Sequence, residues 1–401
     1  MTHIVIIGAG QAASSAAYKL RSLGFSGDIT LIGSEAFPPY QRPPLSKGYL
    51  LGEVKRERMF LRPKASYAEA NIRLILGVNV KSINAKARTI ETDTDTLNYD
   101  EVILTTGSSP ITLPATIGGT LGRVYGVRTL ADIDAMAHEF TKDRRVLIIG
   151  GGYIGLEAAV VSAKMGLKVT VVEMADRILQ RVASPETSDY FRTLHQDHGV
   201  TIIEGAGLQK LVGDGRVTTA ELTNGQTLDI DMAIVGIGIR PNIALAQTAR
   251  IVVDNGISTD AFGRTSLPHI WAAGDCASFP FDGKRIRLES VPNAIDQAET
   301  VAANILGANT EYVAKPWFWS DQFDVKLQIA GLNTGYDSII VRGGARDGSV
   351  SHWYYAGARL LAVDAMNAPR EFMIARRLIV AGKSPNAKAV ADPETDLKSL
   401  M

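Results

Sequence analysis

Two glycine-rich motifs, each between an apolar run and a helix-forming run, hold the residues with the clearest chemistry. The first motif comprises Gly8, Gly10 and Ala13, and the second comprises Gly150, Gly152 and Gly155. In such a motif the first glycine permits a tight turn, the second lets the backbone approach a pyrophosphate, and the small third residue allows helix–strand packing. A helix that begins there directs its unpaired N–H groups at the phosphate charge. Each motif therefore predicts a dinucleotide-binding turn.

An acidic residue follows each motif at the end of the next apolar run. Glu35 follows the first motif, and Glu173 lies 21 residues after Gly152, close to the spacing of about 20 expected for a carboxylate that accepts from ribose hydroxyls. A carboxylate here repels a 2′-phosphate, so the second motif predicts a preference for NADH over NADPH. Arg177 and Arg181 follow closely. They either soften that preference or belong to a solvated helix face.

Buried parallel strands are needed to position these motifs. The order strand, turn, helix, strand occurs twice, over His3–Ile7, Gln11–Leu23 and Ile29–Ile32, and again over Val146–Ile149, Tyr153–Met165 and Val169–Val172. Short apolar runs of this kind are typical of strands covered on both faces. From Lys315 onward, short runs alternate with Gly-rich turns, which predicts antiparallel strands, and a helix is expected over Pro369–Ala381.

The repeated order predicts an α/β protein with two Rossmann-like dinucleotide-binding domains. A C-terminal α+β domain with an antiparallel sheet follows them. The expected boundaries are 1–112 and 241–315 for the two parts of the first dinucleotide domain, 113–240 for the second, and 316–401 for the C-terminal domain.

Composition excludes several classes of protein. The 401 residues include 42 basic and 42 acidic side chains, so no nucleic-acid partner and no anionic membrane surface is expected. The single cysteine, Cys276, excludes an internal disulfide, a catalytic dithiol and a cysteine-ligated cluster. No targeting segment or membrane span is predicted, and the expected location is the cytoplasm.

Two further sets of residues carry little chemistry. Cys276 is expected to be a small buried hydrophobic residue and not a nucleophile. His195 and His198 are three residues apart on one helix face, but no third ligand is near them in the sequence. We therefore expect no metal site.

Eight stretches together resemble the FAD- and NAD(P)H-dependent oxidoreductases with two dinucleotide folds, the glutathione-reductase-like superfamily. Within that superfamily the chain looks most like the bacterial NADH–ferredoxin reductases. The stretches are Ile6–Ala13, PPYQRPPLSK at Pro38–Lys47, Thr105–Gly107, IGGGYIGLE at Ile149–Glu157, VGIGIRPN at Val235–Asn242, WAAGDCA at Trp271–Ala277, ESVPNAIDQA at Glu289–Ala298 and PWFWSDQ at Pro316–Gln322.

The resemblance implies non-covalent FAD in the first dinucleotide fold and NADH in the second. The residues that it places around FAD are Gly8, Gly10, Ala13, Glu35, Arg42, Lys47, Thr106, Gly107, Gly274, Asp275, Val291 and Trp319, and those around NADH are Gly150, Gly152, Tyr153, Ile154, Gly155, Glu173 and Gly238. Asp275 would accept a hydrogen bond from the ribityl chain. Lys47 would lie beside the isoalloxazine, pair with Glu157 and stabilise the anion of reduced flavin, so these two are the expected catalytic residues.

The alternative interpretation is that Lys47 is an ordinary surface lysine. Two departures from the family pattern, Ala13 for glycine and Thr105 for alanine, remove no group that the chemistry needs.

The missing cysteines matter more, because disulfide reductases of this superfamily place paired cysteines against the flavin. Electrons must here leave directly from the flavin. The resemblance implies hydride transfer from NADH to FAD, then single electrons to a [2Fe–2S] ferredoxin that supplies a cytochrome P-450 or a ring-hydroxylating dioxygenase. Alternatives are a rubredoxin reductase or an NADH oxidase of the same fold, or an apoptosis-inducing-factor-like flavoprotein that acts by redox-controlled binding.

Aromatic and basic residues near the C-terminus are candidates for docking. Trp319 is either a core anchor or a residue beside the flavin at the docking face. Arg370, Arg376, Arg377 and Lys383 form a basic set, which either belongs to a solvated helix or attracts an acidic ferredoxin.

Overall fold

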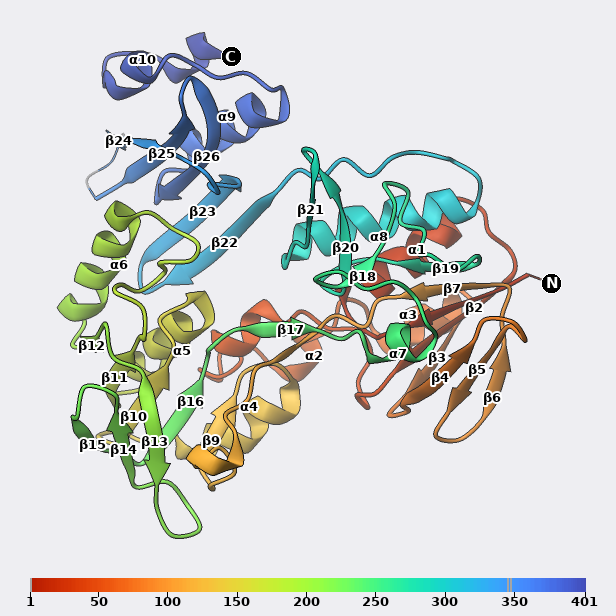
Figure 1. Ribbon diagram of the computed structural model, residues 1–401, viewed down its shortest axis with the longest axis horizontal. Helices are drawn as coiled ribbons and strands as arrows, with labels where there is room; N and C mark the ends of the chain where they lie inside the picture. The colour runs from red at the N-terminus through yellow and green to blue at the C-terminus, as the bar shows by residue number, and fades with distance from the viewer. Residues whose placement is uncertain (1, 345, 347) are drawn as a thin grey trace. The chain divides into compact units, whose positions relative to one another are not determined.

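The computed structural model describes residues 2–344, 346 and 348–401, which form two compact units (Figure 1). The first unit contains the chain up to Arg42, Val54–Ser109 and Ile239–Lys315. The second contains Pro43–Glu53, Pro110–Gly238 and Pro316–Met401. Each unit is built on a parallel sheet, as the repeated sequence order predicts, and the second also carries an antiparallel sheet.

The parallel sheet of the first unit has five strands, in the order β19 (Ile270–Ala272), β7 (Glu101–Leu104), β1 (His3–Ile7), β2 (Asp28–Gly33) and β3 (Ile72–Leu76). Ile4, Val5 and Ile6 of β1 are fully buried because both faces of the sheet are covered. Helices α1 (Gln11–Ser22) and α8 (Val291–Ile305) pack against each other (Figure 1). Buried alanines on both helices allow this close approach.

Smaller elements complete the first unit. They are helices α2 (Arg56–Met59), α3 (Lys64–Glu69) and α7 (Ala244–Thr248), the sheet of β4 (Val80–Asn84), β5 (Thr89–Thr92) and β6 (Thr96–Asn98), the sheet of β18 (Ile257–Ser258), β20 (Ala277–Phe281) and β21 (Lys284–Ile286), and the pair of β8 (Ser108–Pro110) with β17 (Ile239–Pro241). The sequence analysis did not anticipate strand β3 or these small sheets.

The parallel sheet of the second unit repeats the first. Its order is β12 (Thr201–Ile203), β11 (Lys168–Val172), β10 (Arg145–Ile149), β16 (Met232–Val235) and β9 (Val124–Gly126). Helix α5 (Tyr153–Lys164) connects β10 to β11 as α1 connects β1 to β2. The expected internal repeat is therefore present as a repeat of structure.

Around that sheet lie shorter elements of the second unit. They are η1 (Pro43–Ser46), η2 (Ala115–Ile117), α4 (Leu130–Met136), η3 (Ala137–Glu139), α6 (Pro185–Asp197), and the sheet of β13 (Leu208–Val212), β14 (Thr219–Leu222) and β15 (Thr227–Asp229).

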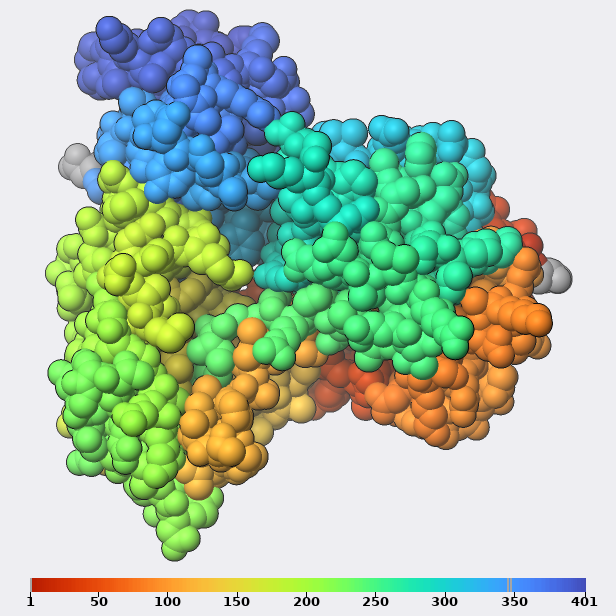
Figure 2. All heavy atoms as spheres, viewed as in Figure 1, coloured from red at the N-terminus to blue at the C-terminus, as the bar shows by residue number. Residues whose placement is uncertain are grey.

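The antiparallel sheet of the second unit has the order β22 (Trp317–Gln322), β23 (Val325–Gly331), β26 (Arg359–Met366), β25 (Val350–Ala356) and β24 (Ser338–Gly343). The predicted antiparallel strands and the predicted helix are confirmed, the latter as α9 (Pro369–Val380), which packs on β23 and β26. Helices α10 (Ala387–Ala391) and η4 (Leu397–Leu400) follow, and the residues after α9 form a continuous outer surface of this unit (Figure 2, dark blue). Among the described helices, none combines the length and the apolar composition that a membrane crossing requires.

Candidate functional site

The glycine turn between β1 and α1 has the geometry of a phosphate-binding turn. Gly8 has φ +116°, and a Cβ there would lie 2.2 Å from the carbonyl oxygen of Thr105. Its N–H donates to Ile32 at 2.8 Å. Gly10 is the N-cap of α1, where no side chain caps the helix and no acidic residue occupies the first turn. A Cβ on Gly10 would meet nothing within 4 Å, so an anion can approach the backbone there.

The turn between β10 and α5 has the same geometry. Gly150 has φ +106°, and a Cβ there would lie 2.5 Å from the carbonyl oxygen of Gly236. Gly152 caps α5 without a side-chain hydrogen bond, and a Cβ on it would meet nothing within 4 Å. Gly155 is the position at which only glycine fits without a clash, because an added Cβ would lie 2.1 Å from the carbonyl oxygen of Gly150. Both turns therefore fit the pyrophosphate of a dinucleotide, with open backbone and uncapped helix N-termini.

Glu35 lies at the end of β2, where it is held by two neighbouring side chains. Tyr40 donates to its Oε2, and Arg42 donates to its Oε1 at 2.7 Å. Arg42 also packs over the Tyr40 ring, 5.0 Å from its centroid. A carboxylate has about four acceptor positions, so Glu35 retains capacity for ribose hydroxyls.

Asp275 and Thr106 lie at the ends of strands of the first unit. Asp275 follows β19 and accepts from Ser108 Oγ at 3.0 Å. Thr106 follows β7, and its hydroxyl donates to the carbonyl of Asn242 at 2.7 Å. The N–H of Gly274 is bound to Gln297 at 2.8 Å, while Gly107 has φ +65°. Val291 is the first residue of α8, after the Ser290 cap.

Glu173 makes both of its hydrogen bonds with the backbone. Its Oε2 accepts from Gly151 N–H at 2.7 Å, and its Oε1 accepts from Ala175 N–H at 2.8 Å. The middle residue of the glycine turn is thus tied to the acid that ends β11. At the start of α5, Ile154 is exposed and Tyr153 packs against Phe318, with ring centroids 5.0 Å apart.

Gly238 has φ +114° and follows β16, the strand that pairs with β10.

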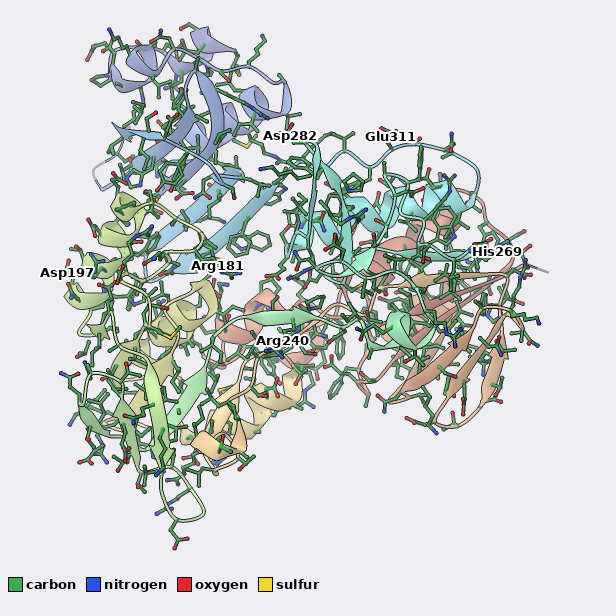
Figure 3. The ribbon with its side chains drawn as sticks, viewed as in Figure 1. Arg181, Asp197, Arg240, His269, Asp282 and Glu311 are labelled. Atoms are coloured by element: carbon green, nitrogen blue, oxygen red, sulfur yellow. The ribbon has the colours of Figure 1, made fainter. Side chains whose placement is uncertain are left out.

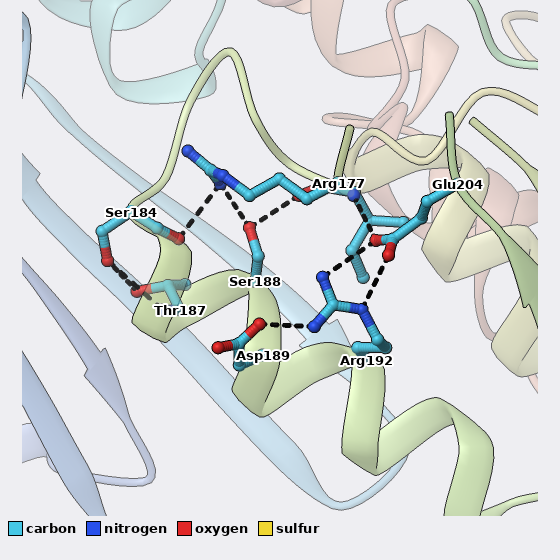
Figure 4. Close-up of polar contacts among 8 residues, drawn as sticks. Arg177, Ser184, Thr187, Ser188, Asp189, Arg192 and Glu204 are labelled. Atoms are coloured by element: carbon cyan, nitrogen blue, oxygen red, sulfur yellow. Dashed lines mark hydrogen bonds and ion pairs between the residues drawn. The ribbon is translucent and has the colours of Figure 1, made fainter. Parts of the chain in front are cut away.

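Arg177 fits neither of the two sequence interpretations, because it is half-buried in a loop outside the helices and its guanidinium is bound within the protein. Its guanidinium donates to the carbonyl of Ser184 and to the hydroxyl of Ser188 (Figure 4). It also donates to the carbonyls of Gln180 and Ala183. These hydrogen bonds from Arg177 hold the loop between β11 and α6 in place. The exposed Arg181, labelled in Figure 3, lies on the same loop.

That loop is attached directly to the glycine turn. Leu179 has φ +56°, which is unusual for a branched residue, and its N–H donates to Gly151 at 3.0 Å. Glu204 accepts from Ile178 N–H at 2.7 Å and pairs with Arg192 (Figure 4). Arg177 and Glu204 thus both hold the segment that touches the nucleotide-binding turn.

Lys47 and Glu157 form an ion pair of 2.7 Å within the second unit. Glu157 is 5% exposed, and two hydroxyls also donate to its carboxylate, Ser46 at 2.8 Å and Ser320 at 2.7 Å. One buried carboxylate thus receives three donors from three different side chains. The Lys47 side chain is therefore bound in an ion pair and is not a free surface lysine.

The cysteine and histidine expectations can be compared with their surroundings. Cys276 is buried, its thiol contacts the carbonyls of Leu104 and Ala273, and burial raises its pKa, as expected for an inert residue. His195 is buried and bonded to Gln322, whereas His198 is exposed and stacks on Phe323. In the described part of the chain, no three potential metal-ligating side chains of His, Cys, Asp or Glu lie together.

Aromatic side chains of β22 and a basic side chain of α9 form a stack. The rings of Trp317 and Trp319 are 5.6 Å apart, and the Arg376 guanidinium lies 5.0 Å from the Trp317 ring centroid. Arg370 pairs with Asp396, while Arg377 is exposed. Trp319 is partly exposed, so it is not simply a core anchor.

The sequence analysis missed several residues of this site. Ser46 and Ser320 are partners of Glu157, yet both lie inside stretches that the analysis singled out, PPYQRPPLSK and PWFWSDQ. For Ser320 the available signal was a hydroxyl directly after the three aromatic residues of β22. The clasp made by Arg177 had no local signal, because its acceptors are mainly backbone carbonyls.

Comparisons with known proteins agree with this geometry. Residues 2–298 match the family described as pyridine nucleotide-disulphide oxidoreductase, and residues 317–401 match the one described as reductase C-terminal. Rhodocoxin reductase of Rhodococcus erythropolis is 42% identical over 399 residues, which cover 98% of this chain and 93% of that relative. A ferredoxin–NAD(P)+ reductase of Sphingomonas sp is 43% identical over 404 residues, which cover 99% of this chain and 97% of that relative.

Among solved structures, a chain in the covalent putidaredoxin reductase–putidaredoxin complex superposes with a TM-score of 0.96 at 38% identity, covering 100% of this chain and 98% of that chain.

Proposed function

We propose an NADH–ferredoxin reductase activity for this chain, which belongs to the pyridine nucleotide-disulphide oxidoreductase family. The observation that carries the proposal is the pair of equivalent phosphate-binding turns, at Gly8–Gly10 and Gly150–Gly152, in a chain whose single cysteine is buried. Two such turns suit two dinucleotides, and a chain without a second cysteine cannot form an internal disulfide.

Flavin and nicotinamide cofactors follow from the family. We propose that the flavin is non-covalent FAD, held by residues 1–112 and 241–315, and that NADH is held by residues 113–240. Flavin, when bound, would supply the ability to take two electrons from NADH and give them up singly, so that one NADH would reduce two ferredoxins and yield NAD+ and a proton. The proposed location is the cytoplasm, since the enzyme draws on NADH.

The residues of this chain bind and orient the cofactors. Gly10 and Gly152 leave the backbone open to pyrophosphate, while Glu35 and Glu173 accept from ribose hydroxyls. Asp275 accepts from the ribityl chain, as the family resemblance suggests. Lys47, held by Glu157, supplies the cation that stabilises the reduced flavin anion.

The proposed electron acceptor is a [2Fe–2S] ferredoxin of a cytochrome P-450 or dioxygenase system. Relatives that cover almost the whole chain are named as ferredoxin reductases, and one similar structure holds a ferredoxin-type partner, putidaredoxin. We place docking on the surface formed by Trp319, Arg370, Arg376 and Arg377, here called the α9 surface. Stacking of Arg376 on Trp317, and of Trp317 on Trp319, brings basic and aromatic groups together there.

Two assays test the activity. NADH–ferricyanide turnover needs no docked protein, whereas cytochrome c reduction through added ferredoxin does. We expect FAD in the supernatant after acid precipitation, fast NADH–ferricyanide turnover, and cytochrome c reduction only when ferredoxin is present. A protein without releasable flavin contradicts the proposal. Rapid consumption of NADH by oxygen alone favours an NADH oxidase, and selective use of rubredoxin favours a rubredoxin reductase.

The α9 surface is tested by charge reversal. Arg377→Glu should raise the KM for ferredoxin roughly 10-fold at low salt, because complementary charge accelerates encounter. Ferricyanide turnover should stay unchanged. Lys388→Glu, with the same charge change on exposed α10, is the matched control. Equal ferredoxin kinetics for Arg377→Glu and Lys388→Glu would place docking elsewhere.

A further inference from the structure

A buried row of polar side chains extends from Glu157 into the second unit. Ser320 Oγ lies 2.7 Å from Glu157 Oε1, Gln322 Nε2 lies 3.3 Å from Ser320 Oγ, and His195 Nε2 lies 2.8 Å from Gln322 Oε1. Ser320, Gln322 and His195 are each 0% exposed. Buried polar groups of this kind are rarely accidental, because each costs free energy if it lacks a partner.

The donors in this row all point toward Glu157. The carboxylate can only accept from Ser320, so the serine oxygen is left to accept from the Gln322 amide nitrogen. The Gln322 carbonyl oxygen must then accept from His195, which requires a proton on Nε2. His195 Nδ1 is buried and has no hydrogen-bond partner among the described residues, which suits a neutral ring with a bare Nδ1. Burial lowers the pKa of His195 to about 4, so the neutral ring persists near pH 7.

A proton relay is a poor explanation for this row. The Gln322 amide would have to change tautomer to pass a proton, and the row ends at an unpartnered nitrogen. A chain of aligned dipoles acts differently, because each bond polarises the next and strengthens the donor that meets the carboxylate. The row therefore suits orientation and charge stabilisation.

The opposite side of Glu157 carries the cation. Lys47 and Ser46 both reach Oε2, whereas Ser320 is the one described residue that donates to Oε1. The two carboxylate oxygens are thus divided between the ammonium and the buried row. Any rotation of the carboxylate that Ser320 prevents would also displace the ammonium.

We propose that Ser320, Gln322 and His195 are positioning residues that hold the Glu157 carboxylate in place, and thereby set where the Lys47 ammonium stands. This inference rests on the proposed function for one consequence only, namely that the buried row of side chains tunes the midpoint potential of the flavin. The hydrogen bonds and the ion pair from which it is inferred all join residues of the second unit. The groups that face His195 are Gln322, the Phe323 ring at 5.1 Å and the neighbouring His198.

The first test uses the unmodified holoenzyme. Histidine labelled with ¹⁵N reports which ring nitrogen carries the proton, and the six histidines are assigned by single substitutions. We expect His195 to show a protonated Nε2 and a bare Nδ1, unchanged between pH 8 and about pH 5.5. A proton on Nδ1, or titration of this ring near neutrality, overturns the proposal.

The second test uses a graded pair of variants. His195→Gln keeps an N–H near the position of Nε2, whereas His195→Leu removes it. We expect His195→Leu to shift the flavin midpoint potential to more negative values and to slow flavin reduction by NADH roughly 2- to 10-fold, the range for one lost neutral hydrogen bond. His195→Gln should restore both. Gln322→Met should resemble His195→Leu, and His198→Leu, on the exposed histidine, should match the parent.

These outcomes separate the two proposals. A lower melting temperature for His195→Leu with an unchanged potential overturns the positioning role and leaves only a structural one. Failure of NADH to reduce the parent flavin refutes the proposed function, while the ¹⁵N result still decides the direction of the hydrogen bonds.

Discussion

The two dinucleotide-binding turns share one backbone and differ in how their acids are held. Gly8 and Gly150 donate to the end of the adjacent strand at the same 2.8 Å, and each faces a carbonyl that a Cβ would strike. Glu35 is bound by side chains, Tyr40 and Arg42, whereas Glu173 is bound by backbone N–H groups. The first acid depends on its neighbours' identity, and the second acid is part of the turn itself.

The third positions of the turns show the same contrast. Ala13 is fully buried in the packing between α1 and the sheet, so the first turn accepts a methyl group. Gly155 accepts none, because of the Gly150 carbonyl 2.1 Å from its would-be Cβ. Helix α5 therefore approaches its turn more closely than the first motif requires of α1.

Exchange of the third residues should produce the largest effect. Gly155→Ala should cost roughly 1–3 kcal/mol of unfolding free energy through overpacking, and should weaken NADH binding. Ala13→Gly should cost about 1 kcal/mol through helix propensity and should retain the flavin. Denaturant melts and the KM for NADH measure the two. Equal effects of the two variants would remove the contrast between the turns.

Neutralisation of the acids should come next. Glu173→Gln leaves a backbone N–H without its carboxylate, which should cost about 1–3 kcal/mol, or roughly 5- to 150-fold in kcat/KM for NADH. The ratio of kcat/KM for NADH to kcat/KM for NADPH should fall, because the neutral side chain no longer repels a 2′-phosphate. Glu35→Gln should change flavin retention and leave the ratio of kcat/KM for the two nicotinamide cofactors unchanged. A parent enzyme that prefers NADPH would contradict the role of Glu173.

The loop clasp should give a smaller effect. Arg177→Lys retains the charge but cannot reach three carbonyls and a hydroxyl at once. We expect a loss of about 1 kcal/mol in unfolding free energy and a few-fold higher KM for NADH, with kcat little changed. Arg181→Lys on the same loop is the control. An altered NADPH preference in Arg177→Lys would mean that this side chain touches the nucleotide after all.

The smallest change in stability is expected at the open glycines. Gly10 and Gly152 have φ −106° and −81°, which alanine adopts, and there is space for a methyl group. Each alanine variant should keep its unfolding free energy within about 0.5 kcal/mol. Gly152→Ala should raise the KM for NADH, and Gly10→Ala should release flavin. Normal cofactor binding in both would show that the pyrophosphates do not approach these residues.

Local patterns were sufficient for much of this protein. The apolar runs before each glycine turn predicted β1, β10 and the helices that follow, and the Gly-rich alternation predicted the antiparallel sheet. Such features depend on residues close in sequence, whose periodicity and backbone needs can be inferred without a fold. The short strand β3 was not predicted, because three of its five side chains are only partly buried and its run carries the exposed Arg73.

The amino-acid sequence by itself determined the two nucleotide turns, their acids and the absence of a redox-active cysteine pair. Only the tertiary structure decided what holds Glu157, because Ser46 and Ser320 are 111 and 163 residues away along the chain. It also decided that Arg177 clasps a loop, since backbone carbonyls carry no mark in the sequence. The physical reason is the same in both cases: a hydrogen bond depends on where packing brings two atoms, and the packing of β22 against α5 is a property of the folded chain.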